Sequence, residues 1–332
     1  MLDSATILIT GGTGSFGKRF VNRIFEKYSP KKVIIYSRDE YKQFTLRQAF
    51  LEHDERIRYF IGDVRDKERL DRAFTGVDYV IHAAALKQVP ACEYNPFEAV
   101  KTNILGAQNV ASVAVDRGVK KVIALSTDKA VNPINLYGAT KLASDKLFIA
   151  ANAYAGAHGT SFSVVRYGNV AGSRGSVIPF FKMLLDKGEK ELPLTDLRMT
   201  RFWITLDEAV SLVFKAINES KGGETYISKI PSFKVSDLAR AMSSHESVRE
   251  IGIREGEKLH EVMITEYDSF HAYEYDEHYI VYPNFDWWSF ENHYTDGGRK
   301  VPEFFRYSSD TNSVWLSVED ITQRLKNIDI VY

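Results

Sequence analysis

Apolar segments alternate with helical patterns through the first half of the chain. Short apolar runs that predict buried strands occur at 6–10, 33–38, 57–62, 79–85, 120–126 and 161–170. Residues at helical spacing lie between them, including the stretches 95–117 and 136–155. Because strands that alternate with helices form parallel sheets through right-handed crossovers, the pattern predicts an α/β fold with a Rossmann-like, doubly wound parallel sheet.

The alternation loosens after residue 170 into glycine-rich and aromatic segments. We expect residues 1–170 to form a dinucleotide-binding domain and residues 171–332 to form mainly a smaller substrate-binding lobe. No repeat, low-complexity segment or clear linker separates the two parts. The boundary is therefore soft, and later elements are expected to return to the sheet.

A glycine-rich turn follows the first predicted strand. The segment Gly11-Gly-Thr-Gly14-Ser-Phe-Gly17 leads from that strand into a helical pattern. Gly11 permits a tight turn, Gly14 lets backbone amides approach a pyrophosphate, and Gly17 lets helix and strand pack closely. A glycine triplet alone is weak evidence, but its place between strand and helix predicts a bound dinucleotide. The candidate ligands are Gly11, Thr13, Gly14, Ser15, Phe16 and Gly17.

The end of the second predicted strand indicates which dinucleotide fits. Ser37 and Arg38 stand where a carboxylate would hold the ribose of NAD, and an arginine can instead hold the 2′-phosphate of NADP. The sequence therefore favours NADP. Lys42, one helical turn beyond Arg38, is either a second cation for this phosphate or a solvated lysine. Asp39 and Glu40 keep NAD open as an alternative.

Further cofactor contacts are predicted where later strands end. Asp63 and Val64 follow the third strand, where an adenine edge could be contacted. Small residues at the end of the run 79–85 let a cofactor lie against the backbone, and His82 inside that run is expected to be a core histidine. Asn103 could reach the cofactor or brace the backbone. The other candidates are Ala83, Ala85, Lys87, Thr102 and Val170.

Chemically active side chains follow the strand 120–126. Tyr137 and Lys141 stand four apart and share a helix face, where a lysine charge can favour a phenolate suited to oxidising an alcohol. Asp128 and Lys129 add an acid and a second possible base, which alcohol oxidation does not need. The sequence therefore predicts an enzyme with a further reaction step. The candidate catalytic residues are Thr127, Asp128, Lys129, Tyr137 and Lys141.

Composition argues against several classes of function. The chain has 43 Lys+Arg and 44 Asp+Glu, a net charge of −1, with no basic stripe for nucleic acid or for a membrane surface. Cys92 is the single cysteine, which excludes an intramolecular disulfide, and no Cys/His spacing predicts a metal site. No apolar run approaches the ~20 residues of a membrane helix, and the first strand leaves no room for a signal peptide. We expect a cytoplasmic protein without metal, nucleic-acid or membrane partners.

A series of ordered motifs carries a family resemblance: 10–17, 36–40, 60–65, 83–87, 125–130, 135–141, 165–169, 172–177, 198–203 and 256–261. In these motifs the chain resembles the extended short-chain dehydrogenase/reductase superfamily. Within it, the chain resembles the UDP-N-acetylglucosamine 4,6-dehydratases of the 5-inverting type, which open pseudaminic acid biosynthesis. It departs from them at Gln88, where relatives tend to have histidine, and in the aromatic-rich segment 282–294.

The resemblance implies dehydration with inversion at C5. Tyr137, kept anionic by Lys141, would remove the proton of the sugar 4-hydroxyl while hydride leaves C4 for NADP⁺. Lys129 would then take the C5 proton as protonated Asp128 delivers a proton to the departing 6-hydroxyl. Hydride would return to C6, and the tightly bound NADP would be regenerated. Because Lys129 acts as a base only when neutral, burial and nearby cations are expected to lower its pKa strongly.

The resemblance also implies a site for a UDP-sugar substrate. Arg198, Arg201 and Arg254 are candidate donors to the diphosphate, and Glu257 is a candidate acceptor for ribose hydroxyls. The segment 172–178 is expected to form a loop over the sugar nucleotide. The substrate candidates are Lys87, Asn169, Ser173, Ser176, Val177, Ile178, Thr195, Arg198, Met199, Arg201, Arg254 and Glu257.

Two alternative functions stay open. One is another sugar-nucleotide enzyme, either a dehydratase that retains the C5 configuration or a 4-epimerase, which has no need of Asp128 and Lys129 to expel water. The other is a noncatalytic NADP-sensing protein, because a fold alone does not establish an activity. The resemblance further implies a homo-oligomer, with a hexamer as the expected form.

Overall fold

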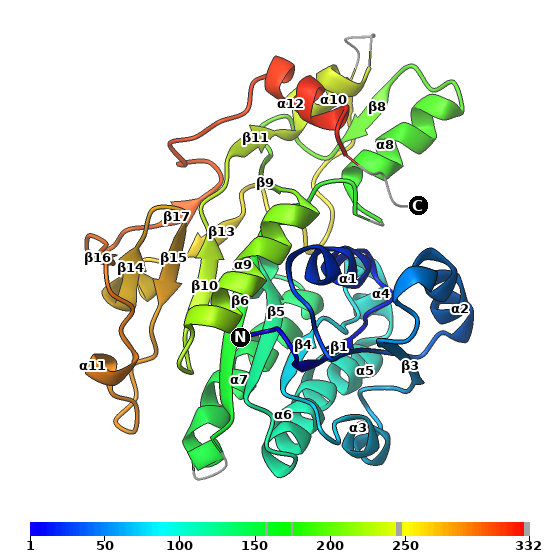
Figure 1. Cartoon of the computed structure of the whole chain (residues 1–332). Coiled ribbons are helices and arrows are strands. Elements are labelled where there is room, and N and C mark those ends of the chain that lie inside the picture. Colours follow the sequence, from blue (N-terminus) through cyan, green and yellow to red (C-terminus); the bar gives the residue numbers. More distant parts are fainter. Residues whose placement is uncertain (157–158, 174, 244–247, 329–332) are drawn as a thin grey trace.

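A large twisted sheet forms the centre of the molecule (Figure 1). The computed structural model describes residues 1–156, 159–173, 175–243 and 248–328. Within these residues, ten strands form one sheet in the order β16-β14-β15-β10-β6-β5-β4-β1-β2-β3. The strands from β10 to β3 run parallel to their neighbours, and β15, β14 and β16 extend one edge in antiparallel pairing. The prediction of a Rossmann-like, doubly wound α/β fold is confirmed.

The parallel strands end in register along one edge of this sheet. Thr10 lies opposite His82, and Ser126 lies opposite Arg166. The order reverses between β1 and β4, the position at which such sheets bind ligands. The run predicted as a strand at 79–85 leaves the sheet after His82. The strands of the sheet are β1 (Thr6–Thr10), β2 (Lys32–Ser37), β3 (Ile57–Ile61), β4 (Tyr79–His82), β5 (Lys121–Thr127), β6 (Ser161–Tyr167), β10 (Thr225–Ser228), β14 (Ala272–Glu274), β15 (His278–Val281) and β16 (Arg299–Lys300).

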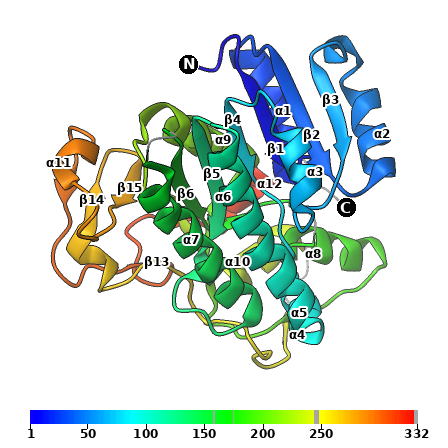
Figure 2. The same cartoon turned by 90° about the horizontal axis from the view of Figure 1, so that it is seen from below.

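Helices cover both faces of the sheet (Figure 2). On one face, α1 (Ser15–Lys27) packs against α9 (Leu206–Glu219), with the rings of Phe20 and Phe214 5.1 Å apart. On the other face, α3 (Lys67–Ala73), α6 (Gly106–Asp116) and α7 (Leu136–Ala155) bury a second apolar layer. The stretch predicted as one helix at 95–117 consists of α5 (Pro96–Ala99), a π-helical turn η2 (Val100–Leu105) and α6. The remaining helices of the N-terminal half of the chain are α2 (Glu40–Ala49) and α4 (Val89–Tyr94).

A smaller lobe stands beside the carboxyl ends of the parallel strands (Figure 1). It has its own apolar core, which includes Trp203 and Phe233 with ring centroids 5.4 Å apart. The elements α9 and β10 interrupt the lobe in sequence and belong to the large sheet. The lobe consists of β7 (Asn169–Val170), α8 (Val177–Asp186), β8 (Leu192–Leu194), β9 (Thr200–Ile204), β11 (Ser232–Lys234), α10 (Val235–Met242), β12 (Val248–Glu250) and α12 (Val318–Leu325).

The aromatic-rich segment 282–294 packs at the antiparallel edge of the large sheet. The ring of Tyr273 in β14 lies 5.2 Å from that of Phe290 in α11 (Phe290–His293). Tyr282 and Trp288 continue the cluster at 5.8 Å. The segment therefore covers the end of the main core, and it contributes no residue to the cavities described below.

Short elements complete the described chain. The strand β13 (Val262–Ile264) pairs with β17 (Tyr307–Ser308), and this pair joins the C-terminal region to the lobe. The single turns are η1 (Leu51–His53), η3 (Asp128–Ala130) and η5 (Asp268–His271), of which η3 directly follows β5. Among the residues described, no helix combines the length and apolar character that a membrane crossing requires.

Candidate active site

Two adjoining cavities lie at the carboxyl edge of the sheet. The first, of about 640 Å³, runs from the glycine turn to η3 and the start of α7. The second, of about 960 Å³, lies between η3 and the lobe. Lys129 lines both cavities, so the candidate catalytic residues lie where the two meet. The other shared lining residues are Ala85, Lys87, Gln88, Asn169, Gly175 and Ser176.

The glycine turn leaves room for a ligand backbone to approach. Gly11 has φ +66°, and a Cβ at this position would lie 2.9 Å from the Cα of Ala84. A Cβ at Gly17 would lie 2.3 Å from the carbonyl oxygen of Gly12, so helix α1 can pack here only with glycine. Gly14 caps α1 without a side-chain hydrogen bond, which leaves amides at the helix start free for phosphate oxygens. This cradle fits the pyrophosphate of a dinucleotide.

The end of β2 presents two cations to the first cavity. Arg38 lies 3.6 Å from Asp63, and Lys42 lies 2.9 Å from Asp39. Asp39 also accepts a hydrogen bond from the backbone amide of Lys42 at 2.9 Å and so caps α2. The Asp39 carboxylate is therefore committed to the helix start and to Lys42.

Most of the predicted cofactor contacts reach the first cavity. The exception is Asn103, which is buried and hydrogen-bonds the amide and carbonyl of Leu86 and the hydroxyl of Thr140. Asn103 braces the backbone of the segment after β4, which is one of the two roles predicted for it, and it does not line the first cavity. His82 accepts or donates a hydrogen bond with Thr10 at 2.8 Å in the core, as predicted. The lining residues are Gly11, Thr13, Gly14, Ser15, Phe16, Gly17, Ser37, Arg38, Lys42, Asp63, Val64, Ala83, Ala85, Lys87, Thr102, Tyr137, Lys141 and Val170.

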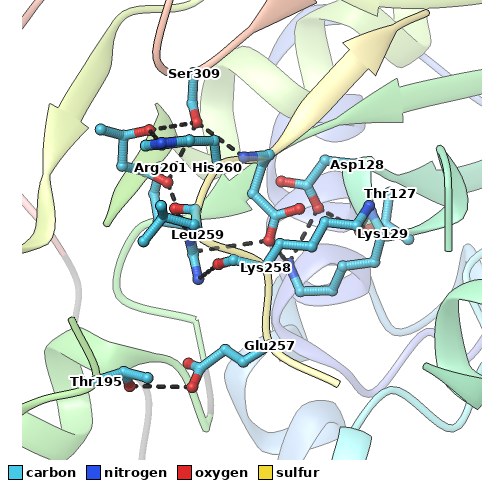
Figure 3. Close-up of polar contacts among 12 residues, drawn as sticks. Thr127, Asp128, Lys129, Thr195, Arg201, Glu257, Lys258, Leu259, His260 and Ser309 are labelled. Atoms are coloured by element: carbon cyan, nitrogen blue, oxygen red, sulfur yellow. Dashed lines mark hydrogen bonds and ion pairs between the residues drawn. The ribbon is translucent and has the colours of Figure 1, made fainter. Parts of the chain in front are cut away.

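A compact charge cluster lies between the cavities (Figure 3). Asp128 is fully buried, and its Oδ1 lies 3.1 Å from Nζ of Lys129 and 2.9 Å from the hydroxyl of Thr127. On its other side, Lys129 Nζ lies 3.2 Å from Oε1 of Glu261. Arg201 Nε lies 3.7 Å from the same oxygen. Two carboxylates and two cations are thus held together; Asp128, Glu261 and Arg201 are buried, and the Lys129 side chain is 24% exposed.

The protonation of this cluster differs from the prediction for Lys129. Burial lowers the pKa of the Lys129 ammonium, but the carboxylates of Asp128 and Glu261 outweigh burial and raise it. The expected fall in the Lys129 pKa is therefore wrong for the folded protein. Burial raises the pKa of Asp128, and the charge of Glu261 raises it further against the opposing charge of Lys129. This direction suits Asp128 as a proton donor.

Tyr137 and Lys141 are both buried at the start of α7. Asn135 caps this helix by accepting a hydrogen bond from the Gly138 amide at 2.8 Å. Burial raises the pKa of Tyr137 to about 12, and the charge of Lys129 opposes this rise. Burial lowers the pKa of Lys141, which Asp145 opposes. The charge of Lys129 therefore favours a Tyr137 phenolate, and the role of Lys141 toward Tyr137 stays a prediction.

The second cavity contains most of the predicted substrate contacts. Thr195 and Glu257 both line this cavity, and Thr195 donates a hydrogen bond to Glu257 at 3.0 Å. Ile178 is instead buried in the lobe core and lines neither cavity. Residue 174 of the predicted loop lies outside the described residues. The lining residues that match the prediction are Lys87, Asn169, Ser176, Val177, Thr195, Met199, Arg201, Arg254 and Glu257, and Ser173 lines the first cavity.

Two of the predicted diphosphate donors are committed elsewhere. Arg198 lines neither cavity and pairs through two nitrogens with Asp196 at 3.0 and 2.7 Å. Arg201 donates to the carbonyl oxygens of Thr200, Lys258 and Leu259 at 2.7, 2.9 and 3.1 Å. The structure therefore does not bring Arg198 to either cavity, and Arg201 mainly fixes the backbone beside the charge cluster.

Glu261 is the main residue that the sequence analysis missed. It belongs to the motif 256–261, but it lies 132 residues from Lys129 and no local pattern links the two. Asp145, also missed, is buried one turn after Lys141 on α7 and accepts a hydrogen bond from Ser126 at 2.5 Å. Its spacing from Lys141 is the only sequence signal that could have indicated it.

The doubly wound sheet, the glycine cradle and the buried Tyr137 and Lys141 define the class of short-chain dehydrogenase/reductase proteins. Within this class, the chain belongs to the polysaccharide biosynthesis protein family, whose model matches residues 7–283. It is 54% identical to UDP-N-acetylglucosamine 4,6-dehydratase (inverting) of Campylobacter jejuni over 99% of both chains. It is 39% identical to a UDP-glucose 4-epimerase of Rickettsia canadensis over 100% of this chain and 98% of the relative.

Solved structures agree with this family. Pen from Bacillus thuringiensis superposes with a TM-score of 0.90 at 39% identity over 98% of both chains. DesIV, a dTDP-glucose 4,6-dehydratase from Streptomyces venezuelae solved with NAD bound, gives a TM-score of 0.68 at 26% identity over 76% of this chain and 86% of its own. The shared fold therefore occurs in proteins that bind a nicotinamide dinucleotide.

Proposed function

We propose that the protein is a hydro-lyase that dehydrates UDP-N-acetylglucosamine across C4 to C6 and inverts C5. The product would be UDP-2-acetamido-2,6-dideoxy-β-L-arabino-hex-4-ulose. The observation that carries this proposal is the contact of Asp128 with Lys129, 3.1 Å apart, at the junction of the two cavities. An acid and an amine at this place are what a dehydration requires beyond alcohol oxidation. The 54% identical inverting dehydratase supports the same substrate.

The first cavity would hold NADP. The glycine cradle would bind its pyrophosphate, and Arg38 with Lys42 would bind the 2′-phosphate. NADP is favoured over NAD because the Asp39 carboxylate already caps α2 and pairs with Lys42. When bound, the dinucleotide would supply reversible hydride transfer with the sugar. It would stay tightly bound, since each cycle regenerates it.

Tyr137, Lys129 and Asp128 would perform the proton transfers. Tyr137 would take the proton of the 4-hydroxyl, helped by the charge of Lys129 and by a hydrogen bond with Thr127. Lys129 would remove the proton from C5 of the 4-keto sugar. Asp128 would protonate the departing 6-hydroxyl, so that water leaves. A proton delivered to the opposite face of C5 would complete the inversion.

The resting ion pair can supply the protonation states that this scheme needs. Lys129 must be neutral and Asp128 must be protonated when the C5 proton is removed. One proton shift from Lys129 Nζ to Asp128 Oδ1, along their 3.1 Å contact, produces both forms at once. The raised pKa of Asp128 supports this shift, and the raised pKa of Lys129 opposes it. The reaction therefore starts from the less populated of two coupled protonation states, the one in which Lys129 is neutral and Asp128 is protonated.

A UDP-sugar 4-epimerase is the second candidate function. The full-length similarity to a UDP-glucose 4-epimerase favours it. An epimerase returns the hydride to C4 and expels no water, so it needs no acid for a leaving hydroxyl. The fully buried Asp128, with its raised pKa, favours the dehydratase over this alternative and over a noncatalytic NADP sensor.

The resemblance supports three wider proposals. The product would enter pseudaminic acid biosynthesis, and the enzyme would act in the cytoplasm as a homo-oligomer, with a hexamer as the expected form. Sedimentation analysis of the purified protein tests the assembly. These proposals rest on the family likeness and are independent of the chemistry at Lys129.

Purified protein incubated with UDP-N-acetylglucosamine in D₂O tests the proposed function. NMR of the early product should show a 4-keto-6-deoxy sugar of the L-arabino configuration with deuterium at C5. A D-xylo product would establish a retaining dehydratase. A C4 epimer without loss of water would establish the epimerase, and no conversion of any UDP-sugar would favour a noncatalytic role.

A further inference from the structure

Glu261 lies beside the proposed base and has no assigned role. Its side chain is 2% exposed, and Oε1 lies 3.2 Å from Lys129 Nζ. Oε2 is buried and has no hydrogen-bond partner among the described residues. A buried carboxylate with an unsatisfied oxygen destabilises a protein unless it is paired. A residue that serves stability alone would not leave this oxygen unsatisfied.

The backbone of Glu261 is held from both sides. Its amide donates a hydrogen bond to the hydroxyl of Ser309 at 2.9 Å, and its carbonyl accepts one from the Ser309 amide at 2.8 Å. The Ser309 hydroxyl in turn lies 2.7 Å from that of Thr200. Glu261 stands directly before β13, which pairs with β17. These contacts fix the carboxylate in position before any substrate enters.

The cluster contains one more carboxylate than Lys129 can neutralise alone. Asp128 and Glu261 both contact Lys129 Nζ, and Arg201 adds a second positive charge on the side of Glu261. Burial raises the pKa of Glu261, but Lys129, Arg201 and Lys258 outweigh it and lower this pKa. Asp128 has the raised pKa of the pair. Of the two carboxylates, Asp128 is therefore the one that can accept the proton of Lys129, and Glu261 remains an anion.

We propose that Glu261 is a positioning residue for the dehydration step, which holds Lys129 Nζ beside Asp128 and remains an anion, so that the proton leaving Lys129 is transferred to Asp128. This inference rests on the proposed function. Glu261 touches neither the reacting carbon nor the leaving oxygen in this scheme. It acts through the two residues that do.

The step balances with Glu261 unchanged. Lys129 begins as an ammonium and Asp128 as a carboxylate, and one proton moves from nitrogen to oxygen between them. The Lys129 amine then takes the C5 proton, and the C5–H electron pair forms the C5=C6 bond. The C6–O bond breaks with its electron pair, and the leaving oxygen takes the Asp128 proton as water. The cluster ends with the same charges as it began.

Charged groups from several elements act on this cluster. Asp128 and Lys129 belong to η3, Arg201 to β9, and Tyr137 to α7. Lys258 and Lys87 approach from the loops before β13 and after β4. Of these groups, only Glu261 and Asp128 are carboxylates in contact with Lys129 Nζ. Removing the Glu261 charge should therefore lower the pKa of both Asp128 and Lys129.

Glu261→Gln tests the proposal, with Glu266→Gln as its matched control. Glu266 is on the same segment but is exposed and pairs with Arg306 at 3.8 Å. Three readouts are needed: NADPH absorbance at 340 nm after mixing with substrate, C5 deuterium exchange in D₂O, and product formation. We expect Glu261→Gln to retain the 340 nm signal and C5 exchange, and to form product about 10²-fold more slowly.

The pH profile distinguishes this role from a structural one. Because Asp128 and Lys129 must keep one proton between them, product formation falls as pH rises through the pKa at which the pair loses that proton, and this limb should move to lower pH in Glu261→Gln. Glu266→Gln should keep the wild-type profile. If Glu261→Gln does not fold, Glu261→Asp is measured instead; it keeps the charge at a longer distance from Lys129, and a smaller loss of product formation with an unshifted limb is expected.

Two results would overturn the proposal. One is product formation by Glu261→Gln within twofold of the wild type. The other is a parallel loss of the 340 nm signal and of product, which would indicate a role in binding or folding. Failure of the wild-type protein to dehydrate UDP-N-acetylglucosamine would instead refute the proposed function, so the two failures are distinguishable.

Discussion

Lys129 Nζ lies 3.1 Å from Asp128 Oδ1, so the proposed base and the proposed acid are hydrogen-bonded to each other. Neighbours in a strand point to opposite faces, but the turn η3 after β5 directs both side chains to the same place. Their protonation states are therefore coupled, and a change at one residue alters the other. This coupling shapes the first two predictions.

Asp128→Asn should separate alcohol oxidation from dehydration. The amide keeps the shape of the carboxyl group but cannot deliver an acidic proton to the leaving hydroxyl. We expect product formation to fall by about 10²- to 10⁴-fold, while C4 oxidation persists. Absorbance at 340 nm in a single turnover, followed by NMR of the product, measures the two steps. Wild-type rates of product formation in this variant would refute the role of Asp128.

Lys129→Met should abolish exchange at C5. The methionine side chain has a similar length but no nitrogen to take the C5 proton, so deuterium incorporation should fall by about 10²-fold or more. Lys120→Met is the control, because Lys120 is exposed and pairs with Asp78 at 2.9 Å at the other end of β5. NMR in D₂O measures the exchange. Unchanged deuterium incorporation in Lys129→Met would assign the base to another residue.

Gly17→Ala should destabilise the protein far more than Gly14→Ala. The added Cβ at Gly17 would lie 2.3 Å from the Gly12 carbonyl oxygen, so helix α1 must shift. Such overpacking costs about 1–3 kcal/mol. At Gly14 the nearest atom would lie 3.3 Å away, and the backbone φ is −74°, which alanine adopts readily. Urea unfolding measures both variants, and equal free energies of unfolding would contradict the packing argument.

Arg38→Ala should weaken NADP binding with little effect on NAD. Loss of a charge-assisted contact to the 2′-phosphate costs about 1.5–3 kcal/mol, which is roughly a 10- to 100-fold rise in Kd. Calorimetric titration of cofactor-depleted protein with each dinucleotide measures the ratio. Arg47→Ala is the control, since Arg47 lies on helix α2, which follows Arg38, and pairs with Asp54 outside the cavity. An equal loss for NADP and NAD would refute the assignment of Arg38.

Acid should destabilise the protein partly through His278. This ring is 2% exposed and stacks between Tyr226 and Tyr275, with centroids 5.7 and 4.7 Å away. Burial lowers the pKa of His278 to about 4. Between pH 6.5 and 4, the unfolded chain binds a proton that the folded protein excludes, so the free energy of unfolding falls as pH falls. The full shift corresponds to about 3 kcal/mol.

His278→Phe should remove this part of the pH dependence, because phenylalanine can stack between the same tyrosines without titrating. Urea unfolding at pH 7 and pH 4.5 measures the difference for both proteins. A decline with acid as steep in His278→Phe as in the wild type would show that His278 does not contribute. His82, whose pKa burial lowers to about 3, should account for part of the decline that remains.

Local patterns were sufficient for the elements that the sequence alone predicts. The glycine turn, the parallel strands and helix α7 depend on nearest neighbours and on short-range spacing. Asn135 caps α7 three residues before Gly138, so the start of that helix is encoded locally. The same spacing places Tyr137 and Lys141 on one face. These features were predicted because each depends on fewer than about 20 residues of chain, the range over which helical and strand periodicity acts.

Long-range pairing determined what the sequence could not predict. Arg201 was expected to bind phosphate, but it donates to carbonyls 57 and 58 residues away. The rise in the Lys129 pKa depends on Glu261, 132 residues away. Arg198 pairs with Asp196. The spacing of residues in the sequence does not decide whether an arginine pairs with a nearby carboxylate or with a ligand. Charges on side chains can be counted in a sequence, but their partners become known only in the fold.

The Ser309 contacts with Glu261 and Thr200 bear on how the enzyme is made. These contacts join residues 48 and 109 positions apart, so the charge cluster cannot assemble until synthesis has passed residue 309. The residues that line the first cavity, in contrast, all lie at or before Leu206. A nascent or prematurely terminated chain could therefore acquire its cofactor before it acquires a working acid and base. Such a chain would bind cofactor without turnover. Activity would therefore require that synthesis has passed β17 and Ser309.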